Sequence, residues 1–599
     1  MRRKTLSVKI GNLSIGSDHS IKTQSMTTAS TMDTVKSVEE AIRIIEAGGK
    51  LVRFTAPNIN EAKNLLNIKK SLLEKGYNTP LVADIHFTPN AALEASTIVE
   101  KVRINPGNYV DKKRFEIKEY DEKSYQDEIE KIKEKFIPLI SSCKENSVAM
   151  RIGTNHGSLS DRIMNRFGDT PIGMVESAME FLRICQDNDY NQIVLSMKSS
   201  NPIVMIHAYR LLVKSMENEN MHYPLHLGVT EAGDGLDGRI KSALGIGTLL
   251  SEGIGDTIRV SLTEDPEFEI PAAEKIIKKI NSISEKNRLK NTDKRAFSFS
   301  KRETLLTEGV GGKNPPIVIS SNSNSFEGNY PDFIFIKDLK NLDKSKKYIM
   351  CHKEFSKNQP KNVFPYFSSL KDFRKSNNTS DSLNFIEIDI KKITNTIIQT
   401  FSNSTVLVLS IDKCSRHDFS NAFRFLEDNE IKIPVVLKGN YRSSDFEQVA
   451  IDASIDLGSL LLEGMGNGVW IETEEFDDKI NELSFLILQN TRTRIFKTDY
   501  ISCPSCGRTK FDLQDTTALV KKYTNHLKGL KISVMGCIVN GPGEMADADY
   551  GYVGSGDGII SLYKGKELVK RNIPSKNAVD ELIHLSLIHI SEPTRLNPI

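Results

Sequence analysis

The sequence predicts an α/β protein with three parts: an N-terminal TIM (β/α)8 barrel, an inserted and degenerate barrel-like α/β domain, and a C-terminal α+β domain. Short β-rich runs alternate with helical stretches from the start of the chain to about residue 275. The 599 residues exceed what a single hydrophobic core organises, so roughly two to four domains are expected. Eight strand–helix units over about 250 residues favour a TIM barrel over a doubly wound open sheet, which is the alternative.

The elements of the predicted barrel follow one another in a regular order. The first clear helix spans Asp33–Ala47, where apolar residues recur at helical spacing, and the pair Gly48-Gly49 ends it. Further helical stretches separate the β-rich runs. We expect strands at residues 21–25, 51–54, 81–85, 101–104, 148–152, 193–197, 225–229 and 257–260.

A polar side chain stands at the C-terminal end of nearly every predicted strand. TIM-barrel enzymes carry their chemistry at this end of the barrel. Because guanidinium forks match phosphate oxygens, the five cations among these residues predict a phosphate ligand with two or more negative charges. The residues are Arg53, His86, Arg103, Arg151, Lys198, Glu231 and Arg259.

Each of these residues, taken alone, also has a structural interpretation. An isolated Arg caps its strand through a surface salt bridge about as often as it binds a ligand. His86 pairs equally well with Asp84 in a structural hydrogen bond. The structural interpretation weakens for a set that recurs at the same place in successive units. Glu231 is the best candidate for a general acid or base, because its neighbourhood, Gly228–Gly233, is small and loop-like.

The middle of the chain predicts a second α/β segment. Residues 281–315 are rich in Lys, Asn and Ser and are expected to form a linker. Residues 458–467 repeat residues 247–256 at six of ten positions, and the alignment places Trp470 opposite Arg259. The repeat keeps the glycines and loses the cation, so we interpret residues 316–490 as structural. Strands are expected at 317–319, 333–336, 385–390, 406–411 and 435–438.

Composition excludes several classes of protein. The 80 basic residues nearly balance the 78 acidic ones, so no basic excess points to nucleic acid. No apolar run reaches the length of about eighteen residues that a membrane helix needs, and no signal core follows the N-terminus, so we expect a cytoplasmic protein without membrane partners. Residues 585–595 look like a translated sequencing adapter. We therefore set residues 585–599 aside and expect the natural chain to be cut near His584.

Three of the seven cysteines are gathered near the C-terminus, in a domain that we expect to span residues 491–584. Cys503 and Cys506 form a Cys-x-x-Cys pair, and Cys537 follows. The pair alone is compatible with zinc, an iron–sulfur cluster or thiol redox chemistry. His526 would complete a Cys₃His zinc site. Three thiolates with a weak fourth ligand would instead suit a cluster with a reactive iron, and Glu544 is the nearest carboxylate.

Seven motifs stand out as a set: Val82–Phe87, Val102–Asn108, Arg151–Leu159, Leu225–Gly233, Leu249–Ser261, Cys503–Arg508 and Gly536–Glu544. Together they resemble the 4-hydroxy-3-methylbut-2-enyl diphosphate synthase family (IspG, also called GcpE), in its long, three-domain form. The resemblance covers about residues 5–275 and 495–584, and no motif position departs from the family pattern. It implies a cytoplasmic oxidoreductase of the methylerythritol phosphate pathway. The substrate would be 2-C-methyl-D-erythritol 2,4-cyclodiphosphate, which two electrons open and dehydrate.

The resemblance also implies a cofactor, partners and roles for individual residues. It implies a [4Fe-4S] cluster, with ferredoxin or flavodoxin as the electron donor. Shorter members of the family look like head-to-tail dimers, so a homodimer and closure of the cluster domain within one chain both remain open. The implied cluster ligands are Cys503, Cys506, Cys537 and Glu544. Glu231 would deliver a proton and Asn540 would orient the substrate. The implied diphosphate contacts are Arg53, His86, Arg103, Arg151, Asn155, Lys198, Arg259 and Ser261.

Overall fold

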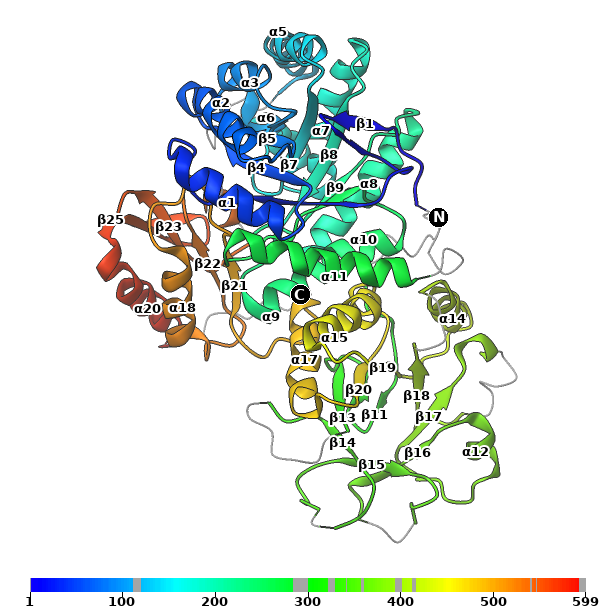
Figure 1. Ribbon diagram of the computed structural model, residues 1–599. Coiled ribbons are helices and arrows are strands. Elements are labelled where there is room, and N and C mark those ends of the chain that lie inside the picture. Colours follow the sequence, from blue (N-terminus) through cyan, green and yellow to red (C-terminus); the bar gives the residue numbers. More distant parts are fainter. Residues whose placement is uncertain are drawn as a thin grey trace. The chain divides into compact units, whose positions relative to one another are not determined.

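The computed structural model divides into two compact units (Figure 1). The major unit comprises Arg2–Leu250, Ile254–Ile277 and Lys497–Ile599, and the insert unit comprises Ser251–Gly253 and Lys278–Phe496. The structure describes residues 2–110, 120–283, 300–321, 329–340, 342–356, 360–393, 401–411, 416–538, 541–545 and 547–591.

The major unit begins with the predicted parallel barrel. Its strand order is β8-β7-β6-β5-β4-β3-β10-β9, and a parallel bridge between Leu195 and Leu225 joins the two ends. All eight strand predictions are confirmed, which closes the barrel and excludes the open sheet. The strands are β3 (Lys22–Met26), β4 (Leu51–Thr55), β5 (Leu81–Asp84), β6 (Lys101–Ile104), β7 (Ala149–Asn155), β8 (Ile193–Lys198), β9 (His226–Leu227) and β10 (Thr257–Ile258).

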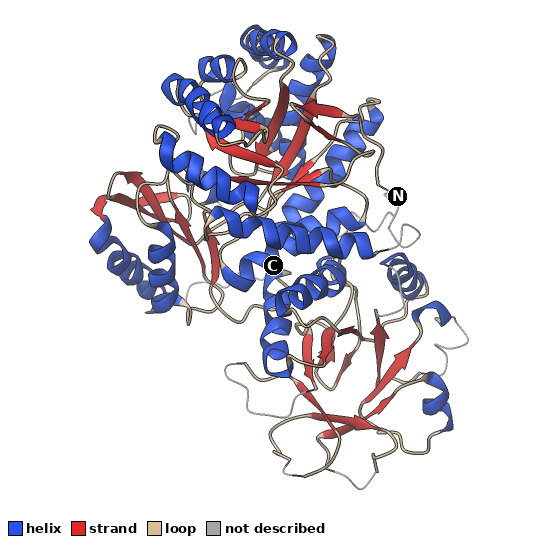
Figure 2. Ribbon diagram, in the orientation of Figure 1, coloured by secondary structure: helices blue, strands red, loops and turns tan. Residues whose placement is uncertain are grey.

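Helices surround this barrel, as Figure 2 shows. The predicted first helix is confirmed as α1, which starts where the Asp33 side chain accepts a hydrogen bond from the Lys36 amide. The helices are α1 (Thr34–Glu46), α2 (Ile59–Glu74), α3 (Pro89–Ala95), α4 (Pro106–Tyr109), α5 (Glu122–Glu145), α6 (Asp161–Phe167), α7 (Pro171–Asp187), α8 (Pro202–Asn218), α9 (Gly235–Ser242), the π-helix η1 (Ala243–Gly247), α10 (Thr248–Ser251), the 3₁₀ turn η2 (Pro266–Phe268) and α11 (Glu269–Ser282).

A hairpin closes the N-terminal end of this barrel. It consists of β1 (Val8–Ile10) and β2 (Leu13–Ile15), which pair antiparallel. Its side chains Val8, Ile10 and Ile15 are buried in one cluster with Leu51, Val82, Ala149 and Val194 of the barrel strands. The opposite, C-terminal end therefore remains for a ligand.

The insert unit is a second barrel, and its sheet is fully closed because β13 pairs with β20. The sequence predicted only part of it, since β15, β16 and β20 were missed. Its strands are β13 (Ile317–Ser320), β14 (Phe333–Ile336), β15 (Tyr348–Cys351), β16 (Val363–Phe367), β17 (Asn384–Ile388), β18 (Thr405–Ser410), β19 (Val435–Tyr441) and β20 (Gly468–Thr473). Its helical elements are α12 (Leu370–Lys375), η5 (Ile390–Lys392), α14 (Arg416–Asp428), α15 (Phe446–Ala453), η6 (Ser454–Gly458), α16 (Ser459–Leu462) and α17 (Asp477–Asn490).

The linker predicted over residues 281–315 is wrong for its last part. Residues 300–315 contain a hairpin of β11 (Leu306–Thr307) and β12 (Val310–Gly311). Val310 is buried in the core of the second barrel, and the Arg302 guanidinium donates to the carbonyls of Ile431 and Ile433. The polar composition concealed this hairpin because few of its side chains enter the core. Residues 284–299 of the predicted linker lie outside the described residues.

The mouth of the second barrel is filled by its own side chains. The Lys438 ammonium lies 3.5 Å from Glu387 and 3.2 Å from Glu472, and 4.3 Å from the Trp470 ring centroid. The Trp470 indole N–H donates to the Ser321 hydroxyl. Two carboxylates thus surround the one cation of this cluster, which gives a phosphate nothing to bind. The prediction that this domain has lost the cations of the first barrel agrees with this arrangement.

Replacing Lys438 by methionine should lower the free energy of unfolding by about 1–3 kcal/mol. The substitution leaves two half-buried carboxylates without their cation, a cost between those of exposed and fully buried ion pairs. Chemical denaturation measures the change. Lys432, whose ion pair with Glu303 is exposed, is the matched control, and its methionine variant should change stability little. Equal stability of the two variants would contradict a structural role for the Lys438 cluster.

The C-terminal domain belongs to the major unit and has the predicted α+β organisation. Its mixed sheet has the order β21-β22-β23-β24-β25, parallel over the first three strands and antiparallel over the last three. The elements are β21 (Asp499–Ser502), α18 (Leu513–Thr524), β22 (Lys531–Met535), α19 (Gly541–Glu544), β23 (Tyr550–Gly556), β24 (Ile559–Lys564), β25 (Glu567–Pro574) and α20 (Ser575–Ser591). Helix α20 enters the segment set aside as adapter-derived, an interpretation that stays a prediction.

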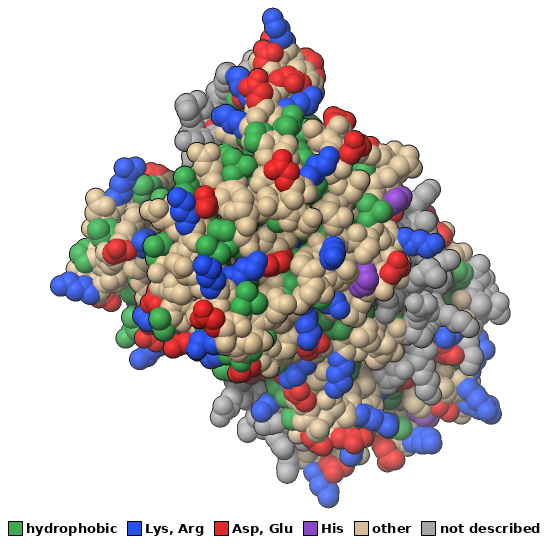
Figure 3. All heavy atoms as spheres, turned by 45° about the horizontal axis from the view of Figure 1, so that its top comes forward, with side chains coloured by type: hydrophobic (Ala, Val, Ile, Leu, Met, Phe, Trp, Pro, Cys, Tyr) green, Lys and Arg blue, Asp and Glu red, His purple; other side chains and the backbone are tan. Residues whose placement is uncertain are grey.

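The surface carries charges of both signs. On the face shown in Figure 3, acidic and basic side chains are interspersed, in keeping with the net charge of +2. Within the described residues, no helix is long and apolar enough to span a membrane.

Candidate functional site

The candidate site is the mouth of the first barrel, where the C-terminal domain covers it within one chain. A pocket there is lined by strand-end residues of the barrel and by the Cys503–Arg508 loop. The predicted diphosphate contacts and Glu231 all lie in it. The lining residues are Met26, Arg53, Asp84, His86, Arg103, Arg151, Asn155, Lys198, Thr230, Glu231, Arg259, Ser261, Cys503, Pro504, Ser505, Cys506 and Arg508.

The cations of the mouth are buried and crowd one another. The pKa of Arg53 is lowered to about 10, chiefly by burial; Asp84 opposes this shift, and the charges of Arg259 and Arg103 add to it. Burial followed by the charge of Arg151 likewise lowers the pKa of Lys198 well below its ordinary value. Asp84 and Glu269 offset only part of this positive charge, and like charges this close are costly. The arrangement therefore favours an anionic ligand.

Two glycines make room for these cations. A β-carbon on Gly228 would lie 2.7 Å from the Lys198 ammonium, and one on Gly153 would lie 2.6 Å from Nε of Arg103. Real side chains do not come so close, so a larger residue at either position would displace the Lys198 or the Arg103 side chain. The close approach of Lys198 thus gives a steric reason for Gly228, the first residue of the loop-like segment around Glu231.

Asp84 organises one side of the mouth. Its carboxylate accepts from Arg103 at 2.9 Å and lies 3.5 Å from Arg508 of the C-terminal domain. Burial alone would raise the pKa of Asp84, but Arg103, Arg53 and Arg508 hold it well below its ordinary value. His86 lies 3.2 Å from the Arg103 guanidinium, and burial with that charge lowers its pKa. His86 is thus a neutral imidazole at the floor of the pocket.

Arg259, like Arg103, has a carboxylate partner, but here the pair is bidentate. Both ends of its guanidinium fork reach Glu269 at 2.9 Å, and Glu269 also accepts from the Ser25 hydroxyl. Such a bidentate pair fixes the guanidinium and neutralises much of its charge. Arg259 lines the pocket as predicted, but as a pre-positioned hydrogen-bond donor with its own counter-ion.

Glu231 lies between the barrel and the cysteines. It is 2% exposed, and its φ of 48° is a left-handed backbone conformation that costs about 1–3 kcal/mol for a residue other than glycine. The next residue, Ala232, forms a parallel bridge with Ser502, and the Glu231 charge acts on the Cys503 thiol. Backbone strain of this kind is retained where it orients a functional side chain. Here it directs the carboxylate toward the covered pocket.

The cysteine site has the donors for a metal cluster. Cys503 and Cys506 are each 8% exposed, and burial followed by the charge of Cys506 raises the pKa of the Cys503 thiol, to which Cys537 also contributes. The Arg508 guanidinium donates to the Cys506 sulfur. Within the described residues, no three His, Cys, Asp or Glu side chains are close enough for a single metal ion, but a cluster of several irons holds its ligands farther apart. The donor set therefore fits an iron–sulfur cluster.

The remaining predicted ligands are placed as follows. Asn540 lies outside the described residues, as does the side chain of Glu544, whose backbone ends α19. His526, the alternative fourth ligand for zinc, is exposed beyond the end of α18, whereas Cys503 and Cys506 are buried. The assignment of all four cluster ligands stays a prediction.

Polar contacts hold the C-terminal domain on the barrel of the same chain. Thr263 lies 3.0 Å from the Ser502 hydroxyl and donates to the Cys503 carbonyl at 3.0 Å. Lys241 forms an ion pair with Asp499 at 2.9 Å. On the other side of the mouth, a β-carbon on Gly157 would lie 2.7 Å from the backbone of Gly543. These contacts complete the site within one chain.

Comparisons with known proteins agree with this geometry. The family model described as the GcpE TIM-barrel domain matches residues 5–274, and the GcpE protein C-terminal domain matches residues 499–587. A 4-hydroxy-3-methylbut-2-en-1-yl diphosphate synthase (flavodoxin) of Parabacteroides distasonis is 50% identical, over 98% of this chain and 97% of the relative. The chain belongs to the GcpE family. Proteins with the same name from Phocaeicola vulgatus and Leptospira interrogans are 47% and 44% identical; the alignments cover 98% of this chain in both cases, and 97% and 96% of the relatives.

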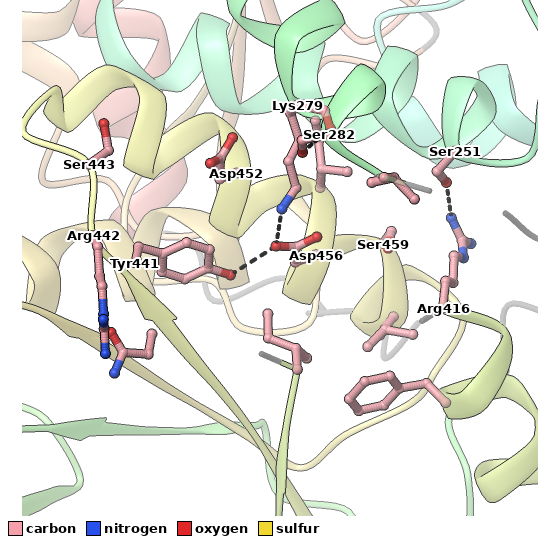
Figure 4. A pocket seen from close by; sticks show the side chains of 16 residues that line it. Ser251, Lys279, Ser282, Arg416, Tyr441, Arg442, Ser443, Asp452, Asp456 and Ser459 are labelled. Atoms are coloured by element: carbon pink, nitrogen blue, oxygen red, sulfur yellow. Dashed lines mark hydrogen bonds and ion pairs between the residues drawn. The ribbon is translucent and has the colours of Figure 1, made fainter. Parts of the chain in front are cut away.

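A larger cavity in this GcpE-family chain lies in the insert unit. It measures about 480 Å³ and contains the pairs Lys279–Asp456, at 2.6 Å, and Arg416–Ser251, at 3.0 Å (Figure 4). Arg416 also contacts Glu463 at 2.6 Å. The cations of this cavity are thus directed at groups of the protein itself. The smaller pocket at the mouth of the first barrel remains the better candidate for the GcpE site.

Sequence reasoning missed the partners of the predicted residues. Arg508 belongs to the motif Cys503–Arg508, and its signal was a cation two residues after the Cys-x-x-Cys pair. Glu269, the counter-ion of Arg259, lies ten residues farther on at the start of α11. Its only signal was a carboxylate in the first turn of the helix after the last strand, a position that many surface residues share.

Proposed function

We propose that this GcpE-family chain converts 2-C-methyl-D-erythritol 2,4-cyclodiphosphate into 4-hydroxy-3-methylbut-2-enyl diphosphate, in the methylerythritol phosphate pathway of isoprenoid synthesis. Two electrons and one net proton open the ring and release water. One observation carries the proposal: the buried thiols of Cys503 and Cys506 and the cations of the barrel mouth line the same pocket. A reductive reaction on a diphosphate needs a redox group and an anion clamp on opposite sides of the substrate.

The residues of the clamp have hydrogen-bond donors that an anion could use. In Arg151, Nε and Nη1 are buried without a hydrogen-bond partner among the described residues. The Lys198 ammonium and the Arg53 guanidinium lie in the same pocket. In the part of the chain that the structure describes, Arg53 donates only to the weakly accepting sulfur of Met26, at 2.8 and 3.0 Å. Diphosphate oxygens are stronger acceptors, and binding them relieves the repulsion among these cations.

Glu231 is the proton donor in this proposal. Its carboxyl group lies beside the cysteine loop on the pocket side that faces the barrel. The strained backbone holds it there before substrate arrives, so little reorganisation is needed when a hydroxyl group leaves as water. Asn540 would help to orient the substrate.

Cys503, Cys506, Cys537 and Glu544 would hold a [4Fe-4S] cluster. When bound, the cluster supplies electrons one at a time to the substrate carbon that loses its oxygen. Arg508 compensates the thiolate charge from the protein side. The relatives are named for flavodoxin, and we propose a flavodoxin or ferredoxin as the donor for this chain.

The C-terminal domain acts as a lid over the mouth. With the lid closed, the pocket offers about 50 Å³, well below the roughly 300 Å³ of small-molecule sites. Substrate entry therefore requires the lid to open, and closure then excludes water from the clamp. Because the lid contacts the barrel of its own chain, we propose that closure occurs within one chain.

Protein purified without oxygen is expected to contain about four iron and four acid-labile sulfide per chain. It should convert the cyclic diphosphate when reduced flavodoxin is supplied. The Cys503→Ser variant removes one thiolate and should lose most of the sulfide and all turnover. Metal analysis and product chromatography measure both. Cys143, buried in the barrel wall, provides the matched control for a Cys→Ser change remote from the site.

A zinc site on a barrel that acts on a phosphorylated sugar without redox chemistry is the rival function. About one zinc and no sulfide, persisting after anaerobic reconstitution, would favour it and overturn the proposed reduction. The exposed position of His526 provides no fourth ligand for that site.

A further inference from the structure

Lys101 is a fully buried lysine that does not line the pocket of the proposed clamp. It is the first residue of β6 and is 0% exposed. Its ammonium lies 3.4 Å from Oε1 of Gln24 on β3, a long hydrogen bond to a neutral acceptor. Lysine is almost never fully buried unless a carboxylate pairs with it. The position therefore requires an explanation.

The register of the barrel places Lys101 beneath the phosphate clamp. It precedes Arg103 by two residues on the same strand, so both side chains point into the barrel. Its register partners, Val82 and Ala149, belong to the apolar cluster under the N-terminal hairpin. Lys101 thus separates the apolar floor from the layer of guanidinium groups above it.

The groups that face Lys101 give it no counter-charge. Arg151 on β7 and Arg53 on β4 both repel its ammonium, and burial is the largest of the effects that lower the pKa of Lys101 well below its ordinary value. His226 on β9 also faces it, and burial followed by the charges of Lys198, Arg151 and Lys101 keeps that imidazole neutral. Among the described residues, the groups acting on Lys101 are cations. Enclosure beside a neutral acceptor and the surrounding positive charges therefore disfavour a proton on Lys101 while the clamp holds no anion.

We propose that Lys101 is a positioning residue that takes up a proton from solvent when a doubly negative ligand binds to Arg53 and Arg151. The two negative charges cancel the repulsion from the guanidinium groups, so the amine becomes an ammonium. The new charge attracts the diphosphate from below without touching it, and Gln24 accepts one of its N–H bonds. The inference deepens the proposed function, on which it rests for the identity of the ligand.

The sign of the pH dependence follows from this order of events. Ligand binding raises the pKa of Lys101, so between the two pKa values binding consumes a proton. Affinity for the dianion then falls as pH rises through that window, by up to about tenfold per pH unit. A cyclic diphosphate is well suited to the test, because each of its phosphoryl groups carries one ester and one anhydride oxygen, has a single strongly acidic proton and stays ionised except in strong acid. The ligand therefore contributes no titration of its own near neutral pH.

The test is calorimetric titration of the anaerobic protein with the cyclic diphosphate and no reductant, so that binding occurs without turnover. Buffers of different ionisation enthalpy give the number of protons taken up at each pH from 7 to 9. The wild type should take up about one proton more than Lys101→Met, and the variant should bind about tenfold more weakly at pH 7. Lys101→Arg, which stays charged, should retain tight binding and lose the extra uptake.

The outcomes separate the inference from the proposed function. A Lys101→Met protein that takes up as many protons as the wild type overturns the inference, whatever its stability. A merely structural lysine would shift the unfolding midpoint but not the proton count. If the wild type does not bind the cyclic diphosphate at all, the proposed function itself fails. Because Lys101→Arg keeps a positive charge at this position, its proton count decides the matter even if the methionine variant folds poorly.

Discussion

The Glu231→Gln variant is expected to lose about 10²- to 10⁴-fold in kcat while keeping its iron and sulfide content. Glutamine has the shape of the carboxylic acid and can hydrogen-bond at the same place, but it has no proton to transfer. Glu231 is buried against the lid, where Ala232 pairs with Ser502, so bulk water does not replace it easily. Steady-state rates with reduced flavodoxin, at saturating cyclic diphosphate, measure the effect.

Glu264→Gln is the matched control for this prediction. Glu264 follows the last barrel strand near the mouth and pairs with Arg239 at 2.6 Å, outside the pocket. Its replacement should leave kcat within about twofold. Normal turnover by a Glu231→Gln protein with a full cluster would show that Glu231 is not the proton donor and that another group supplies the proton.

The first barrel could be predicted almost completely because its sequence marks both ends of each strand. A short apolar run ends in a polar residue such as Arg53 or His86, and a helical stretch follows. The second barrel lacks these polar markers at several strands. In β16, Pro365 interrupts the apolar run, and β20 was noticed only as the continuation of a repeat. The hairpin β11–β12 is too short for a periodic signal.

The site could be predicted in its composition but not in its pairings. Strand alternation places Arg103 and Arg151 inside a barrel mouth, and that follows from sequence. Which cation already has a counter-ion depends on residues far along the chain, such as Glu269 for Arg259. The same reasoning missed Lys101, since a lysine at the start of a strand is usually exposed. Only closure of the barrel shows that its amine is enclosed.

The Arg151→Met variant should bind the cyclic diphosphate about 30- to 3000-fold more weakly than the wild type. Losing one partner of a buried charge pair costs about 2–5 kcal/mol, and 1.4 kcal/mol corresponds to a factor of ten. Arg151 is 2% exposed and repels Arg53 and Arg103, while burial lowers its own pKa. Removing it therefore relieves repulsion in the free protein. The same substitution should leave the unfolding midpoint unchanged or raise it.

These opposite effects distinguish a binding role from a structural one. An arginine that caps its strand would lose stability on replacement and leave affinity unchanged. Arg239→Met is the control, because Arg239 has its own carboxylate partner and lies outside the pocket. It should lower stability slightly and leave the dissociation constant unaltered. If Arg151→Met behaves like this control, the cations of the barrel mouth do not act as a diphosphate clamp. If affinity falls while stability is maintained, the uncompensated charge at Arg151 is there to bind the ligand.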